Sequence, residues 1–327
     1  MRKNPRPLRH YLTASLPHWA AIAIGSLLLA SAALAQSYPS RPIRFIVPFP
    51  PGTSADVVGR LVALKSAERL GQQVVVDNRS GASGTIGVET AARAAPDGYT
   101  WGLGTTTTHA LAQILNPKLS YDALRDFAPV ALVGETPYFL TTNPAFPASN
   151  VREFVDHARA NPGKVSYASV GNFSMGHLAG ELLKKAGGFE MVHVPYKGSN
   201  LALIDLLAGR IQLNVSTIPA SLPHASAGKL RALAVASRRR VATLRDTATV
   251  AESGFPDYEA VLWMGAFVPA RTADAVLARI RRDVGAVLDS TDMRDALAAQ
   301  AFEPGKLGTS AIKLANRNVT RRRDMAQ

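Results

Sequence analysis

The chain has 327 residues, of which 47% are hydrophobic and 19% are charged. This balance excludes an extended disordered protein and a multi-span membrane protein, and the length suits one or two domains of roughly 150 residues each. The absence of cysteine excludes disulfides, thiolate metal sites and a cysteine nucleophile. The formal net charge is +13, but much of it lies near the two ends, which weakens the case for a polyanion partner.

The first 35 residues have the pattern of a secretory signal peptide. Basic residues at positions 2, 3, 6 and 9 precede an apolar run over 19–34, which ends in the small-x-small site Ala33-Leu34-Ala35. The run is shorter than the roughly 20 residues that a membrane-spanning helix needs. We therefore predict cleavage after Ala35 and a soluble periplasmic protein, with an uncleaved membrane anchor as the alternative.

Two arginine runs, at 238–240 and 321–323, carry part of the positive charge. Runs of this kind are most often solvated turns or chain ends. No aromatic-rich basic motif accompanies them, so we expect no nucleic-acid partner.

Short apolar runs alternate with helical patterns along the mature chain. Strands are predicted over 43–48, 74–76, 100–103, 165–168, 191–194, 211–215 and 230–236. Helices are predicted over 55–70, 84–94, 151–158, 177–186, 200–208 and 273–287, and Asn150 is the predicted N-cap of the third. The alternation is typical of βαβ units, which predicts an α/β fold with mostly parallel sheets flanked by helices.

Two longer segments, 106–150 and 237–270, are rich in Pro, Gly, Ser and Thr, and each contains one predicted strand, at 138–142 and 261–268. If both segments cross between domains, the first domain comprises residues 36–137 and 255–327 and the second comprises 138–254. A single large sheet is the alternative, but the usual size of domains favours two.

Polar, glycine-rich turns follow several predicted strands and lead into helices, at 49–56, 81–87, 169–177 and 193–199. Ligands of open α/β folds bind at the carboxyl ends of parallel strands. A helix start adds unpaired N–H groups and a positive dipole end, both of which suit an anion. Two facing sheets would then form a cleft for a small anion, with the crossings as a hinge. Simple tight turns, with Asp56 as a cap, are the alternative.

Cofactor and catalytic motifs have little support. The glycines at 81, 84 and 87 match neither the dinucleotide fingerprint nor the P-loop, and the seven histidines form no metal motif, so we expect no cofactor and no metal. A secreted serine hydrolase would use Ser174 with His177. Ser174 lacks the G-x-S-x-G elbow because Asn172 replaces its first glycine, and a base on the same helix turn is poor triad geometry.

These turns and their neighbouring strands resemble the tripartite tricarboxylate transporter receptor family, the Bug-type extracytoplasmic solute receptors of Gram-negative bacteria. The resemblance runs in register from about residue 38 to about 270. The segments that carry it are 43–60, 78–100, 121–133, 160–184, 192–213, 228–237 and 263–270.

The resemblance implies a two-domain periplasmic binding protein of the Venus flytrap, type II-like kind. Such a receptor captures a carboxylate, an amino acid or an amide-like compound between its domains and delivers it to a two-component membrane permease. It implies a monomer with no catalytic residue. A sensor receptor that presents its ligand to a membrane signalling protein is the alternative, because it would use the same cleft.

Family positions that face the ligand are carried over residue by residue. The ligand-binding residues implied are Phe49, Pro50, Pro51, Gly52, Thr53, Ser54, Ala82, Ser83, Thr106, Thr107, Ser169, Gly171, Asn172, Phe173, Ser174, Lys197, Gly198, Ser199 and Asp205.

Three of these residues depart from the family pattern. Thr53 replaces the second glycine of PFPPGG, Ser83 replaces a glycine of GAGG, and Phe173 replaces the second glycine of SxGxGS. We expect the Phe173 ring to narrow the pocket or to offer the ligand an aromatic face, so that Phe173→Gly changes ligand preference more than stability.

Overall fold

The computed structural model describes residues 38–305. The predicted signal peptide and the arginines at 321–323 lie outside the described residues. Tyr38, Pro39 and Ser40 form a short bend in a unit of their own. The unit that starts at Arg41 holds all the helices and strands that the structure describes.

The first sheet combines parallel and antiparallel strands. Its order is β2-β1-β3-β9-β4, in which β1 pairs in parallel with β2 and β3, while β9 is antiparallel to both β3 and β4. The strands span β1 Ile43–Val47, β2 Val74–Asn78, β3 Thr100–Thr105, β4 Phe127–Thr142 and β9 Val261–Pro269. The prediction of mostly parallel strands therefore holds at one edge of this sheet, and β9 and β4 reverse direction beside it.

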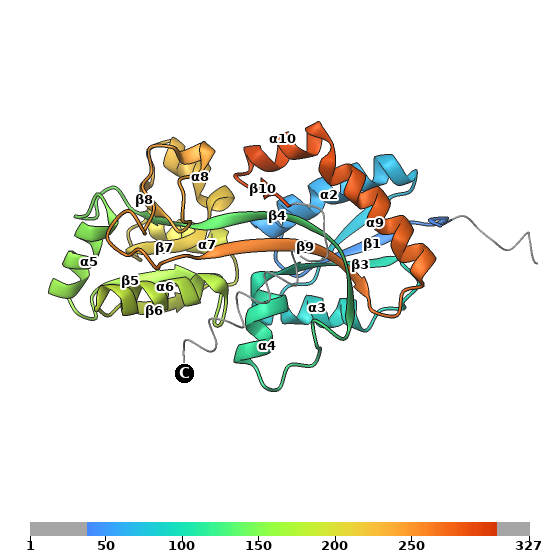
Figure 1. Ribbon diagram of the computed structural model, residues 1–327. Helices are drawn as coiled ribbons and strands as arrows, with labels where there is room; N and C mark the ends of the chain where they lie inside the picture. The colour runs from blue at the N-terminus through green and yellow to red at the C-terminus, as the bar shows by residue number, and fades with distance from the viewer. Residues whose placement is uncertain (1–37, 306–327) are drawn as a thin grey trace, which may run out of the picture. The chain divides into compact units, whose positions relative to one another are not determined.

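The second sheet is built on the far half of β4. Tyr138 to Thr142 pair antiparallel with β7 and β8, and β5 lies in parallel between β7 and β6. The strands span β5 Ser166–Ser169, β6 Val192–Pro195, β7 Leu213–Thr217 and β8 Arg231–Val235. Because β4 belongs to both sheets, it is the continuous link between them, and β9 runs beside it in Figure 1.

The helices span α2 Ser54–Leu70, α3 Thr85–Ala92, α4 Ala112–Leu115, α5 Val151–Ala160, α6 Met175–Gly187, α7 Ser199–Leu207, α8 Ile218–Ser226, α9 Asp274–Asp289 and α10 Thr291–Ala299. Helices α2, α3, α6 and α7 connect the strands of the two parallel runs, as the alternating pattern predicts, and the other helices lie outside these connections. The predicted cap of α5 is confirmed, since the Asn150 side chain accepts a hydrogen bond from the backbone N–H of Glu153. Among the described residues, no helix is both long and apolar enough to span a bilayer.

The core of the first sheet collects large side chains from distant segments. Ile46, Phe127, Trp263 and Phe267 are buried together, and burial of each such side chain stabilises the fold by about 1.5–3 kcal/mol. The His109 ring stacks on Phe267 with centroids 4.2 Å apart. Burial lowers the pKa of His109 to about 3, so this histidine is a neutral core residue.

Segment 106–150 is more regular than its composition suggests. It contains a π-helical turn at Thr107–Leu111, helix α4 and the 16-residue strand β4, of which only the last five residues were predicted. The first part of this strand was not predicted because it contains Pro129 and Pro137. Proline in a sequence argues against a central strand, since it is normally confined to edges and bulges. Pro129 lies at a bulge, where the register with β9 shifts.

Candidate functional site

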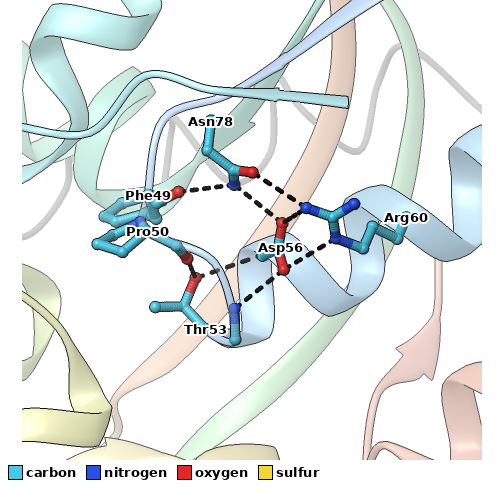
Figure 2. Close-up of polar contacts among 7 residues, drawn as sticks. Phe49, Pro50, Thr53, Asp56, Arg60 and Asn78 are labelled. Atoms are coloured by element: carbon cyan, nitrogen blue, oxygen red, sulfur yellow. Dashed lines mark hydrogen bonds and ion pairs between the residues drawn. The ribbon is translucent and has the colours of Figure 1, made fainter. Parts of the chain in front are cut away.

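The turn between β1 and α2 is held by a network of side chains (Figure 2). Thr53 Oγ1 accepts from the N–H of Asp56 at 3.4 Å and donates to the carbonyl of Pro50 at 2.8 Å. The Asp56 carboxylate accepts from the Gly52 N–H at 2.9 Å and from Arg60 Nε at 3.0 Å. The capping role that was the structural alternative for Asp56 is therefore observed, and it gives the turn a defined shape.

Asn78 connects this turn to the neighbouring strand β2. Its amide donates to the Phe49 carbonyl at 3.0 Å and to Asp56 Oδ1 at 2.9 Å. Burial alone would raise the pKa of Asp56, but the hydrogen bonds from Arg60, Gly52 and Asn78 outweigh it and leave the pKa below its usual value. Asp56 is therefore ionised at neutral pH.

A cavity of about 60 Å³ lies beside this turn. This is several times the roughly 10–15 Å³ that one water molecule requires, so it can admit a small solute. Residues of both sheets and of the turns that follow their strands contribute to it. The lining residues are Phe49, Pro50, Thr53, Ser54, Ala55, Thr105, Thr107, Tyr138, Val170, Lys197, Gly198, Ser199, Val215, Ser216, Thr217, Leu262 and Met264.

Three hydrogen bonds around the cavity join segments of the first sheet to segments of the second. Ser54 Oγ and Thr217 Oγ1 are 2.5 Å apart, and both residues line the cavity. The Met175 N–H donates to Thr107 Oγ1 at 3.1 Å, and Ser83 Oγ donates to the carbonyl of Asn172 at 2.7 Å. The start of α2 is thus hydrogen-bonded to the end of β7 in the second sheet, and the start of α6 is hydrogen-bonded to Thr107, which follows β3 of the first sheet.

The structure brings eight of the predicted ligand-binding residues to the cavity. They are Phe49, Pro50, Thr53, Ser54, Thr107, Lys197, Gly198 and Ser199. The other predicted residues lie outside its lining: Pro51, Gly52, Ala82, Ser83, Thr106, Ser169, Gly171, Asn172, Phe173, Ser174 and Asp205.

Loop 169–174 lies mostly outside the cavity, and two of its hydroxyls have partners elsewhere. Ser169 Oγ is 2.7 Å from His193 Nε2, and Ser174 Oγ accepts from the His177 N–H as the cap of α6. Phe173 is 57% exposed, and only Val170 of this loop joins the lining. The Phe173 ring is therefore not among the residues that line the cavity, and no contact in the structure supports its expected effect on the pocket.

Two predicted residues have structural partners of their own. The Asp205 carboxylate accepts from the Tyr196 hydroxyl at 2.7 Å and from Arg210 Nη1 at 2.8 Å. Thr106 Oγ1 accepts from the Trp263 N–H at 2.9 Å and thereby ties the end of β3 to β9. Both residues support the scaffold beside the cavity.

Nine further residues line the cavity without having been predicted as ligand-binding: seven lie on strands, Ala55 lies on α2 and Val170 follows β5. They are Ala55, Thr105, Tyr138, Val170, Val215, Ser216, Thr217, Leu262 and Met264. Thr217 had a detectable signal, because it ends a parallel strand and precedes a helix, as the predicted turns do. Leu262 and Met264 had none, since an apolar strand residue gives no indication of which cavity it faces.

Ser174 and His177 do not form a nucleophile–base pair. Ser174 is fully buried, and His177 Nδ1 accepts a hydrogen bond from the Phe173 N–H at 3.1 Å. Among the described residues there is also no cluster of three His, Asp or Glu that could hold a metal ion.

A stack of two histidines lies beside this loop. The rings of His177 and His193 are 4.0 Å apart between centroids and inclined by 13°. Burial lowers the pKa of His193 to about 4, with a further contribution from His177, and burial also lowers the pKa of His177. Both rings are therefore neutral at pH 7.

A family model for the tripartite tricarboxylate transporter family receptor matches residues 58–327. The chain belongs to this family. Protein BugT of Bordetella pertussis is 37% identical over 284 residues, which cover 86% of this chain and 87% of BugT. A Pseudomonas sp. protein encoded between tcbD and tcbE is 37% identical over 263 residues, or 80% of this chain and 78% of that protein.

Solved structures of family members have the same fold. A structure described as a periplasmic transporter is 40% identical, with a TM-score of 0.82 over 86% of this chain and 96% of that chain. A Rhodopseudomonas palustris protein solved with adipate is 34% identical (TM-score 0.84, 88% and 96% covered). MatC of R. palustris, solved with malate, is 30% identical (TM-score 0.83, 89% and 100% covered).

These similarities identify the fold as that of a two-domain periplasmic binding protein of the Venus flytrap kind, and the chain as a solute-binding receptor rather than an enzyme.

Proposed function

We propose that this receptor captures a small carboxylate-bearing molecule in the cavity and delivers it to a two-component permease of the tripartite tricarboxylate type. The observation that carries the proposal is the cavity lining. The starts of α2 and α7, the side chain of Lys197 and several hydroxyls converge on it, and within the described part of the chain no carboxylate lines it. Such surroundings favour an anion over a cation. The adipate and malate in the two R. palustris relatives agree with this ligand class.

The proposed mechanism is closure of two domains on the ligand. The domains are those expected from the sequence: residues 36–137 with 255–327, and residues 138–254. The two sheets support this division, because β4 passes from one sheet to the other close to Tyr138, the first residue that pairs with β7. In this mechanism, the hydrogen bonds of Ser54 with Thr217 and of Ser83 with Asn172 form when the domains close.

The proposed site of action is the periplasm, and the proposed active form is a monomer released by cleavage after Ala35. The family and the fold support this location. The signal sequence supports export. Amino-terminal sequencing of the exported protein tests the cleavage site, and its mass in solution tests the monomer.

A thermal-shift screen of carboxylic acids, amino acids and nicotinamide-like compounds tests the ligand class with the mature protein, residues 36–327. A ligand at 100 times its Kd should add roughly 2.7 kcal/mol to the free energy of unfolding. Lys197→Met and Ser199→Ala should reduce the shift, whereas the matched control Lys164→Met, at an exposed lysine outside the lining, should keep it. The proposal fails if no carboxylate raises the melting temperature while an uncharged or cationic compound does.

Delivery is tested separately from binding. Deletion of the gene should abolish uptake of the ligand, and a complementing copy with Lys197→Met should restore less uptake than one with Lys164→Met. If binding is tight but uptake is unaffected by deletion, the role in delivery is wrong and the binding role stands.

A further inference from the structure

We propose that the ligand is a monocarboxylate with a short apolar tail, and that the receptor discriminates against dicarboxylates of the same length. This inference rests on the proposed function and adds a substrate class to it. The evidence is the uneven distribution of polar and apolar side chains around the cavity.

Polar groups gather where helices begin. Ser54 opens α2 and Ser199 opens α7, and the first-turn N–H groups of a helix have no intrahelical acceptor. Lys197 precedes α7, and among the lining residues in the described part of the chain it is the one with a charged side chain. One carboxylate can be accommodated here, with one cation to balance it.

Strands β9, β7 and β4 make a different wall. Leu262 and Met264 are two residues apart on β9 and therefore lie on the same face, while Trp263 between them belongs to the core of the first sheet. Val215 on β7 and Tyr138 on β4 complete this wall. All four wall side chains are at most 7% exposed, so the wall is fixed by packing.

The polar atoms near this wall do not supply a second anion site. Burial raises the pKa of Tyr138, so its phenol stays neutral, and it accepts a hydrogen bond from the Gly176 N–H. Ser216 Oγ is 2.9 Å from both Asn214 Nδ2 and Ser221 Oγ. Thr105 Oγ1 lies within hydrogen-bond distance of Thr108 Oγ1.

A second carboxylate against this wall would be buried without a counter-charge, which is strongly unfavourable. Methylene groups or a ring would instead lose only contact with water, which is favourable. The cavity volume of about 60 Å³ favours a short tail of a few carbon atoms.

Isothermal titration of the mature protein with three matched pairs of acids tests the inference. The pairs are butyrate with succinate, hexanoate with adipate, and benzoate with terephthalate. In the pair that binds most tightly, we expect the monocarboxylate to bind at least thirtyfold more tightly than the dicarboxylate. A smaller preference, or a preference for the dicarboxylate, overturns the inference.

A second cation in the cavity lining should reverse part of this preference. Val170 lines the cavity and is half-buried, so Val170→Lys adds a cation without replacing a core residue. It should improve dicarboxylate affinity at least tenfold relative to the monocarboxylate. The control is Val192→Lys on β6, where the side chain is 51% exposed and outside the lining, and it should leave both affinities unchanged.

The outcomes separate this inference from the proposed function. Tight binding of a dicarboxylate overturns the inference alone and supports the carboxylate receptor. If none of the six acids binds while the wider screen still finds another carboxylate, the inference alone fails. If no carboxylate binds at all, both fail.

Discussion

Phe173 combines a bulky side chain with a backbone conformation that favours glycine. Its φ is 61°, in the left-handed region, and the sequence motif that this loop resembles has glycine at this position. The left-handed conformation costs an ordinary residue about 1–2 kcal/mol. The ring is 57% exposed and makes an edge contact with His177 at 6.3 Å between centroids, which recovers little of this cost.

Phe173→Gly should therefore raise the free energy of unfolding by up to about 1 kcal/mol, because glycine removes the backbone strain. Urea denaturation measures the change. Phe173→Ala is the matched control, since it removes the same ring but keeps the Cβ atom, and it should gain nothing. A glycine variant no more stable than the alanine variant would contradict the strain argument.

Asp56 contributes to stability through its charge. Its folded-state pKa lies below the usual value, so its stabilisation is complete above the unfolded pKa and is lost as the pH falls through the folded pKa. Asp56→Asn should cost about 1–3 kcal/mol at pH 7, since a buried charge-assisted acceptor is lost.

This cost should shrink as the pH is lowered below 4, where wild-type Asp56 is protonated as well. Urea denaturation at several values between pH 3 and pH 7 measures it. The exposed carboxylate Asp97, which pairs with Arg41 on the surface, is the control: Asp97→Asn should change stability by less than about 1 kcal/mol. A cost for Asp56→Asn that is independent of pH would refute the role of charge.

At the scale of elements, the histidine stack joins β6, which carries His193, to the start of α6, which carries His177. Strand β5 contributes Ser169, whose Oγ contacts His193 Nε2. The Phe173 N–H needs an unprotonated Nδ1 on His177. Two nearby charges also act on His193: the Glu181 carboxylate raises its pKa, and the Lys184 ammonium lowers its pKa further. Protonation of His177 on Nδ1 would remove the acceptor of the Phe173 N–H, and burial makes a charge on either ring unfavourable.

The folded protein should consequently lose stability as the pH falls from about 6.5, where an unfolded histidine begins to bind a proton, towards 4, where folded His193 does so. His193→Gln should flatten this part of the stability profile by about 1–3 kcal/mol. Denaturant melts between pH 4 and pH 8 measure it. His109 contributes to the slope in both proteins, so the difference between them isolates His193. Parallel profiles would show that His193 titrates normally.

At the scale of the whole molecule, polar contacts between the two sheet regions are few and specific. Ser83 has a φ of 54°, and its hydroxyl donates to the carbonyl of Asn172, which lies in the turn after β5 of the second sheet. A hydrogen bond that forms only on domain closure should stabilise the ligand-bound form more than the open form.

Ser83→Ala should weaken ligand affinity by about three- to tenfold, the equivalent of one hydrogen bond, with little change in the stability of the ligand-free protein. Isothermal titration with the best ligand of the screen measures it. Thr90→Ala is the control, because the exposed Thr90 hydroxyl bonds only within its own helix, to Ile86. Equal affinities of Ser83→Ala and wild type would mean that this bond plays no part in closure.

Local patterns by themselves determined much of this protein: the alternation of strands and helices, the Asn150 cap, the turn at 49–56 and the family motifs all depend on residues close together in the chain. Tertiary structure alone decided which residues form the cavity. Leu262 and Met264 reach it through pairing of β9 with β3 and β4, at separations that no local pattern encodes. Loop 169–174 lies largely outside it, and its Ser169 hydroxyl instead contacts His193, which is distant in sequence. Motifs describe local geometry, whereas a cavity is a product of long-range packing.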